Sequence, residues 1–153
     1  MSLEIDDSLL ESIRAHGRSQ YPNECCGLIL GGIEDDHKRA LHLSPQENTR
    51  ADSPQNRYLI APAAMLAAEK DARSRGLDIV GVYHSHPDHP ARPSEFDREH
   101  AVPWYSYIIV GVTAGSDAEL TCWTLRDDRS AFEEEPLVGR TSARGEIQGA
   151  GGG

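Results

Sequence analysis

Histidine is concentrated in one short stretch of this chain, YHSHPDHPARPSEFD, which spans residues 83–97 and holds three of the seven histidines. His84 and His86 are separated by one residue, and such positions in a β-strand project to the same face. Two imidazole rings placed in this way can bind one metal ion. Asp97 follows His86 after ten intervening residues, several of them prolines, and this loop can return the carboxylate to the strand end.

Two neutral imidazoles and one carboxylate form a ligand set that zinc accepts in catalytic sites, where a fourth position stays open for water. Zinc brings the pKa of such a water close to neutral pH. The pattern alone leaves alternatives open, because an HxH pair also occurs by chance on surface strands. Other residues in this region compete as ligands by composition: Asp88, His89, Glu95 and Glu99.

A hydrolytic site also needs a general base that reaches the water without binding the metal. Glu24 is a candidate because it immediately precedes the apolar run CCGLIL at residues 25–30, which is expected to be a buried strand. A solvated acid is not expected beside a buried strand. Spacing along the chain does not place Glu24 near the histidines.

Hydrophobic patterning predicts the elements that position these residues. Helices are expected at residues 6–21, 62–76 and 94–101, from helical spacing, proline at a first turn and a glycine cap. Ser94 occupies the N-cap position of the last helix. Strands are expected at residues 25–33, 39–45, 57–61, 77–86, 105–112 and 118–126.

This order of elements predicts a mixed α/β fold. Strands outnumber helices, and three successive strands after the first helix favour hairpin pairing. We therefore expect one curved, largely antiparallel β-sheet flanked by helices, forming a single domain over residues 1–132. The segment 133–153 has no apolar period and ends in glycines, which predicts a flexible C-terminal tail.

Composition argues against several classes of protein. The chain has 153 residues, a formal net charge of −10 and a pI of about 5.0, which disfavours binding to nucleic acid or to an anionic membrane. No apolar run approaches the roughly 20 residues of a membrane span, and the acidic N-terminus does not resemble a signal peptide. A cytoplasmic location is expected.

Cys25, Cys26 and Cys122 are too few for a disulfide scaffold and are expected to be buried.

The stretch HSHPDHPARPSEFD has the form H-S-H-P-x(6)-S-x(2)-D. This form resembles the signature of the JAMM metalloproteases, also called the MPN or Mov34/PAD-1 domain. The upstream NECCGLILGG resembles the second element of that family, a glutamate followed by a small residue, Cys-Gly and an apolar strand. The resemblance covers about residues 19–125 and implies the cytidine-deaminase-like architecture of the family, a curved mixed sheet flanked by helices.

The resemblance also implies a role for each matching residue. His84, His86 and Asp97 match the ligands of one zinc ion per chain. Glu24 matches the general acid/base, which takes a proton from the attacking water and delivers it to the leaving amine. Ser94 matches the serine that donates a hydrogen bond to the developing oxyanion, an interaction worth a few kcal/mol in comparable sites.

Because the chain has little room for insertions, it resembles the small, single-domain bacterial and archaeal members. Those members act on ubiquitin-like sulfur-carrier proteins that end in Gly-Gly. The resemblance therefore implies a zinc peptidase or isopeptidase that cuts after the Gly-Gly of such a carrier, for carrier processing or cysteine release. Asn48 and Arg57 lie in a loop that resembles a substrate-side segment and are candidates for substrate contact, with ordinary loop structure as the alternative.

A binding module that recognises the carrier tail without cutting it is the alternative. The complete set of matching ligands disfavours this alternative, and the metal content of the purified protein discriminates the two. The sequence leaves the oligomeric state open, a dimer included.

Overall fold

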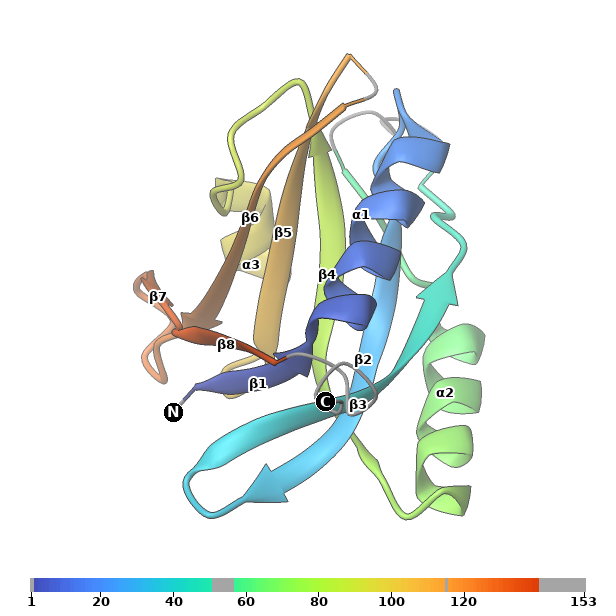
Figure 1. Cartoon of the computed structure of the whole chain (residues 1–153), viewed down its shortest axis with the longest axis vertical. Helices are drawn as coiled ribbons and strands as arrows, with labels where there is room; N and C mark the ends of the chain where they lie inside the picture. Colours follow the sequence, from blue (N-terminus) through green and yellow to red (C-terminus); the bar gives the residue numbers. More distant parts are fainter. Residues whose placement is uncertain (1, 51–56, 115, 141–153) are drawn as a thin grey trace, which may run out of the picture.

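One mixed β-sheet organises the chain, and the computed structural model describes residues 2–50, 57–114 and 116–140 of it. Within these residues the sheet has eight strands in the order β7-β6-β5-β4-β2-β3-β1-β8 (Figure 1). The strands are β1 Leu3–Asp6, β2 Cys26–Glu34, β3 His37–Gln46, β4 Asp78–Pro87, β5 Ser106–Thr113, β6 Ser116–Leu125, β7 Phe132–Glu134 and β8 Leu137–Arg140. The helices are α1 Asp7–Gln20, α2 Pro62–Ser74 and α3 Glu95–His100. The predicted fold class is confirmed.

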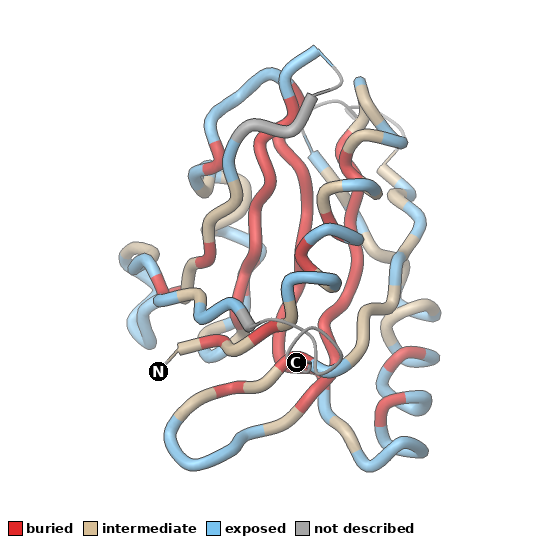
Figure 2. Tube along the Cα trace, in the orientation of Figure 1, coloured by how far each residue is buried: buried red, intermediate tan, exposed pale blue. Residues whose placement is uncertain are grey.

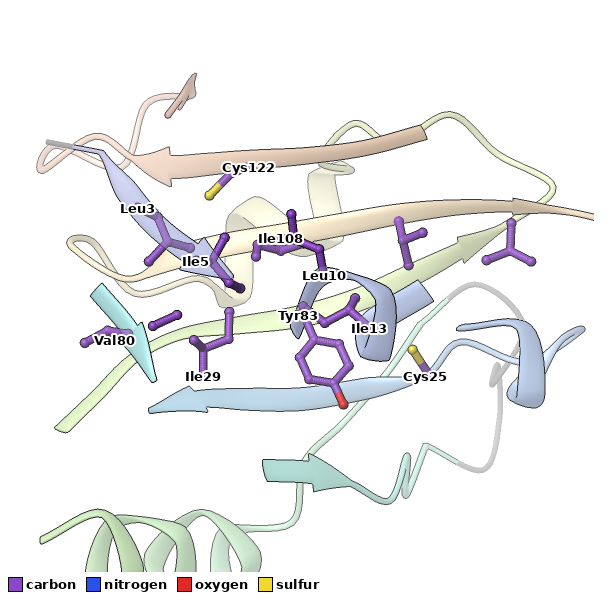
Figure 3. Close-up of a cluster of buried hydrophobic side chains, with 13 residues drawn as sticks. Leu3, Ile5, Leu10, Ile13, Cys25, Ile29, Val80, Tyr83, Ile108 and Cys122 are labelled. Atoms are coloured by element: carbon purple, nitrogen blue, oxygen red, sulfur yellow. The ribbon is translucent and has the colours of Figure 1, made fainter. Parts of the chain in front are cut away.

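Helix α1 covers one face of the sheet, the face turned toward the viewer in Figure 1. Its Leu10 and Ile13 pack into a buried cluster with residues of β1, β2, β4 and β5, such as Ile5, Ile29 and Ile108 (Figure 3). The central strands are buried along most of their length (Figure 2), as expected for strands covered on both faces.

Helix α2 packs on the opposite face against β2 and β4. Ala68 and Ala72 of this helix lie in a second buried cluster with Leu28 and Val82. Val82 and His84 are two residues apart in β4, so the two side chains project to the same face of the strand. The metal-site histidines therefore belong to the face that α2 covers.

The antiparallel pairing of β2 with β4 fixes what lies beside the histidines. Cys26 pairs with His84, and Gly27 with Tyr83. A Cβ atom at Gly27 would lie 2.2 Å from Cε2 of Tyr83, so glycine is required for this close approach. The Cys-Gly step of the sequence thus allows β2 to run close beside the end of β4.

The strand predicted at residues 57–61 is wrong. In the structure this segment is irregular, and its backbone forms hydrogen bonds with the preceding loop instead of with a strand. The Leu59 amide donates to Asn48 Oδ1, and the Leu59 carbonyl accepts from the Thr49 amide. The Leu59 side chain is exposed, so the apolar letters of this segment do not mark a buried strand.

The expectation of a structureless segment from residue 133 onward needs correction. Residues 132–134 form β7, and residues 137–140 form β8, which pairs in parallel with β1. Residues 141–153, the rest of the predicted flexible tail, lie outside the described residues. Strand β1 was also not predicted, because four residues are too few to show a period.

The three cysteines are buried and unpaired with each other, as predicted. Among the described residues, no helix is long and apolar enough to cross a membrane.

Candidate metal centre and active site

Three potential ligand atoms meet at the C-terminal end of β4. Nε2 of His84 lies 3.1 Å from Nε2 of His86, and Oδ2 of Asp97 lies 3.4 Å from the first nitrogen and 3.3 Å from the second. We call these three atoms the ligand triangle. Asp97 comes from α3, so the proline-containing loop does return this carboxylate to the strand end.

The dimensions of the ligand triangle fit a tetrahedral metal ion. Metal–ligand bonds of about 2.0–2.1 Å, as zinc makes to imidazole and carboxylate, place tetrahedral ligand atoms roughly 3.3–3.4 Å apart. The observed edges of 3.1, 3.3 and 3.4 Å are close to this value. Two imidazole nitrogens and one carboxylate oxygen, with a fourth position free, form the donor set of a catalytic zinc site.

The surroundings of the two imidazole rings favour metal binding. Nδ1 of His86 lies 2.9 Å from the carbonyl oxygen of Pro90, which holds the proton on Nδ1 and leaves Nε2 free to bind a metal. The His84 ring stacks on Tyr58 with the ring centroids 4.6 Å apart. Burial lowers the pKa of His84, against the opposing charge of Asp97, and favours the neutral ring that a metal requires.

A capping box at the start of α3 orients the third ligand. The Asp97 amide donates to Ser94 Oγ over 3.1 Å, and the Ser94 amide donates to Asp97 Oδ2 over 2.9 Å. Burial alone would raise the pKa of Asp97, but the charge of His84 and the hydrogen bonds from His84, His86 and the Ser94 amide hold it well below its usual range. Ser94 Oγ accepts only the Asp97 amide in this motif, so its own hydrogen stays available for donation.

Glu24 lies beside the ligand triangle. The Ser85 amide donates to the Cys25 carbonyl, which continues the β2–β4 register by one residue and places Glu24 opposite His86. Glu24 is 3% exposed, and its Oε1 has no hydrogen-bond partner among the described residues. Burial, and secondarily the charge of Asp97, raise the pKa of Glu24 to about 9. A buried carboxyl that holds its proton beside a metal site can act as a proton shuttle.

Two cavities flank the ligand triangle. The first, which we call the basic pocket, measures about 280 Å³ and is lined by Glu24, His86, His89, Pro90, Arg92 and Ser94. The second, the apolar groove, measures about 220 Å³ and is lined by residues that include Tyr58, Leu59, Met65, Phe96, Asp97 and Val102. A linear substrate that crosses the metal site can therefore lie partly in each cavity.

The two residues expected to contact substrate have different surroundings. The Asn48 side chain is engaged within the chain: Nδ2 donates to the carbonyls of Glu24 and Arg57, and Oδ1 accepts from the amides of Arg50 and Leu59. The Arg57 guanidinium lies 4.8 Å from the centre of the Phe96 ring, next to Asp97 in sequence. Arg57 thus stands beside the apolar groove, whereas Asn48 is placed to hold Glu24 and its loop.

The other acids and the other histidine of this region, which could also have bound the metal, lie outside the ligand triangle. Asp88 accepts from the Tyr21 hydroxyl, and Glu95 pairs with Arg98. His89 is exposed and lines the basic pocket. Glu99 is also exposed.

Sequence reasoning missed Tyr58, Arg92 and the Pro90 carbonyl. Tyr58 and Pro90 act through spatial contacts that no spacing rule predicts. Arg92 had a local signal, because a basic residue between two prolines stands only two positions before Ser94.

A family model described as prokaryotic homologs of the JAB domain matches residues 6–126, most of the chain. The chain belongs to this family. The resemblance to JAMM or MPN proteins seen in the sequence is thereby confirmed. The matched range includes every residue of the ligand triangle, together with Glu24 and Ser94.

Several curated JAB relatives are similar in sequence. A probable TtuB-protein conjugate cleaving protease of Thermus thermophilus is 37% identical over 71% of this chain and 70% of its own length. A desampylase of Haloferax volcanii is 35% identical over 71% of this chain and 78% of its own length. A CysO-cysteine peptidase of Mycobacterium tuberculosis is 28% identical over 88% of this chain and 89% of its own length.

Solved structures share this fold. A protein from Desulfitobacterium hafniense matches with a TM-score of 0.79 and 29% identity over 92% of this chain and 94% of that one. A JAB1/MPN domain protein from Archaeoglobus fulgidus matches with a TM-score of 0.52 and 22% identity over 90% of this chain and 97% of that one, which shows the shared fold.

Proposed function

We propose that this JAB protein is a zinc-dependent peptidase or isopeptidase that hydrolyses the bond after the C-terminal Gly-Gly of a ubiquitin-like sulfur-carrier protein. The observation that carries the proposal is the ligand triangle with Glu24 beside it. The names of the relatives support the substrate class, since they refer to cleavage of TtuB conjugates, desampylation and a CysO-cysteine peptidase.

His84, His86 and Asp97 would hold the zinc ion. When bound, zinc supplies Lewis-acid polarisation of the scissile carbonyl and lowers the pKa of the attacking water. Glu24 accepts a proton from that water and passes it to the leaving amine, which its burial near the metal site allows. Ser94 donates its hydroxyl hydrogen toward the carbonyl oxygen as negative charge develops there.

The alternative, a non-catalytic module that binds the carrier tail, needs neither a metal nor a proton shuttle. A buried carboxyl oxygen without a hydrogen-bond partner, such as Glu24 Oε1, lowers stability. Its retention beside three ligand atoms favours catalysis over tail binding.

The test combines metal analysis with a cleavage assay. The purified protein is expected to hold about one zinc ion per chain, and Asp97→Ala is expected to lose it. A Gly-Gly carrier that bears a short C-terminal peptide is expected to be cut by the zinc-loaded protein and spared after chelation. Stoichiometric zinc without any cleavage of such carriers would leave the binding-module alternative.

A further inference from the structure

The side of the metal site that receives the leaving group can be assigned from Glu24. Hydrolysis breaks the bond between the glycine carbonyl carbon and the amine nitrogen; water supplies the oxygen to the carbon, and its proton reaches the nitrogen through Glu24. The leaving nitrogen must therefore lie within reach of Glu24. Glu24, Ser94 and His86 all line the basic pocket, whereas Glu24 does not line the apolar groove. Glu24 also lines a third cavity of about 380 Å³ beside Asn48, but neither Ser94 nor any residue of the ligand triangle lines that cavity. The leaving group thus occupies the basic pocket.

Arg92 brings a positive charge to this pocket. Among the described residues, no carboxylate forms an ion pair with the Arg92 guanidinium, although the chain has 25 acidic residues against 15 lysines and arginines. The acids that flank Arg92 in the sequence, Asp88 and Glu95, form other contacts. Asp88 accepts from the Tyr21 hydroxyl over 2.7 Å and from the Ala114 amide over 3.1 Å. Glu95 is held by Arg98 of the same helix.

Arg92 is exposed and lines the leaving-group pocket, and its guanidinium matches a carboxylate, to which it can donate two parallel hydrogen bonds. The carboxylate of a free amino acid is two bonds from the amine nitrogen that leaves. It therefore falls in the same small pocket of about 280 Å³. In an isopeptide, the leaving nitrogen is the end of a lysine side chain, and the nearest carbonyl belongs to a neutral backbone amide several bonds away.

We propose that Arg92 binds the α-carboxylate of the leaving group, so that the preferred substrate carries a single amino acid after its Gly-Gly. This inference rests on the proposed function. It selects release of an amino acid over cleavage of a lysine isopeptide.

Two substrates that differ only in one charge test the inference. The first is a ubiquitin-like carrier that ends in Gly-Gly-Cys with a free carboxylate, and the second is the same protein with a C-terminal carboxamide. The zinc-loaded wild type is expected to cleave the acid with a kcat/KM about tenfold higher than the amide, the size of one charge-assisted hydrogen-bonded contact. Arg92→Gln is expected to remove this preference by slowing the acid alone, and Arg92→Lys to keep part of it.

Arg73→Gln is the matched control, because Arg73 is an exposed arginine near the end of α2, outside both cavities that flank the metal. It removes the same charge and is expected to keep the full preference for the acid. Zinc content is measured for each variant, so that loss of metal is separated from loss of recognition.

The outcomes separate the two levels of the proposal. Equal rates for acid and amide in the wild type, or an equal slowing of both by Arg92→Gln, overturn the role of Arg92 and leave the cleavage activity standing. A lysine isopeptide of the carrier that is cut faster than the acid overturns the choice of leaving group. No cleavage of any carrier by the zinc-loaded protein overturns the proposed function itself, and this inference with it.

Discussion

At the scale of single residues, the site depends on Glu24, a buried carboxyl group beside the metal ligands. Glu24 is buried, and burial raises its pKa to about 9, so the carboxyl is neutral near pH 7 without metal. A divalent cation in the ligand triangle would oppose this shift, because an adjacent positive charge favours the ionised carboxylate. The same residue can therefore hold or release a proton according to what occupies the site.

Replacement of Glu24 by glutamine is expected to abolish turnover and leave the metal in place. The amide keeps the shape of the side chain but cannot accept the proton of the attacking water, and the loss of an acid/base group costs about 100-fold or more. Cleavage rates and zinc content measured on the same preparation check this. Glu99→Gln, an exposed change on α3, serves as control. Full activity in Glu24→Gln would remove Glu24 from the proposed mechanism.

In the metal-free protein, Glu24 is expected to lower the free energy of unfolding as pH rises from about 4.5 to about 9. Glu24 has its pKa raised from 4.5 to about 9 in the folded state. The unfolded chain therefore releases this proton at a lower pH than the folded chain does, and unfolding becomes more favourable across that window. Urea unfolding in the presence of a chelator measures the slope. Glu24→Gln should flatten the slope, and an unchanged slope would show that Glu24 is not the group responsible.

At the scale of elements, the sequence predicts the parts of the site that depend on local periodicity. His84 and His86 share a face because strand side chains alternate, and Asp97 is held because Ser94 and Asp97 form a capping box at the start of α3. Glu24 could be linked to them only through the resemblance, since its position depends on the pairing of β2 with β4, 60 residues apart at Cys25 and Ser85.

Other elements could not be predicted for the same reason. Strands β1 and β8 have four residues each and are stabilised by pairing with each other and, for β1, with β3. Residues 57–61 carry apolar letters typical of a strand, yet Asn48 and Thr49 bind their backbone in a loop. Non-local hydrogen bonds outweigh local preference in both cases.

Asn48 is expected to position Glu24 rather than to contact substrate. Its Nδ2 group donates to the Glu24 carbonyl and the Arg57 carbonyl, and Asn48→Asp replaces these donors by a carboxylate oxygen facing two carbonyls. A shift of Glu24 by about 1 Å can lower the rate as much as 100-fold. We expect kcat to fall, with KM and zinc content nearly unchanged, in steady-state assays.

Thr49→Ala is the matched control for Asn48→Asp. The Thr49 hydroxyl donates to the Leu59 carbonyl, so its loss weakens the same loop without touching Glu24. If both variants lower kcat equally, or if Asn48→Asp raises KM alone, Asn48 acts on the loop or on the substrate and not through Glu24.

At the scale of the whole molecule, a buried ion pair joins the C-terminal segment to the sheet. Nζ of Lys38 on β3 lies 3.4 Å from Oε2 of Glu135, which follows β7, and each side chain is 1% exposed. Ser106 Oγ donates to the other carboxylate oxygen of Glu135 over 2.5 Å, and Lys38 also donates to the Trp104 carbonyl. Ser106 begins β5 and pairs with Gly81 in the first half of β4. The ligand triangle lies at the other end of β4, so these contacts are away from the metal site.

Removal of one partner of this pair is expected to destabilise the fold more than removal of both. Glu135→Leu leaves the Lys38 ammonium buried without its counter-charge, which costs about 3–5 kcal/mol, whereas Lys38→Met combined with Glu135→Leu replaces both charges by apolar groups of similar size. Free energies of unfolding from urea titration of the two variants and the wild type measure the difference. The double variant should recover most of the stability lost in the single variant, less the contribution of the Ser106 hydrogen bond.

Because the pair lies away from the metal, zinc content and cleavage by the folded double variant should match the wild type. Equal destabilisation of both variants would mean that the pair acts through its hydrogen bonds to Ser106 and Trp104 rather than through mutual charge compensation.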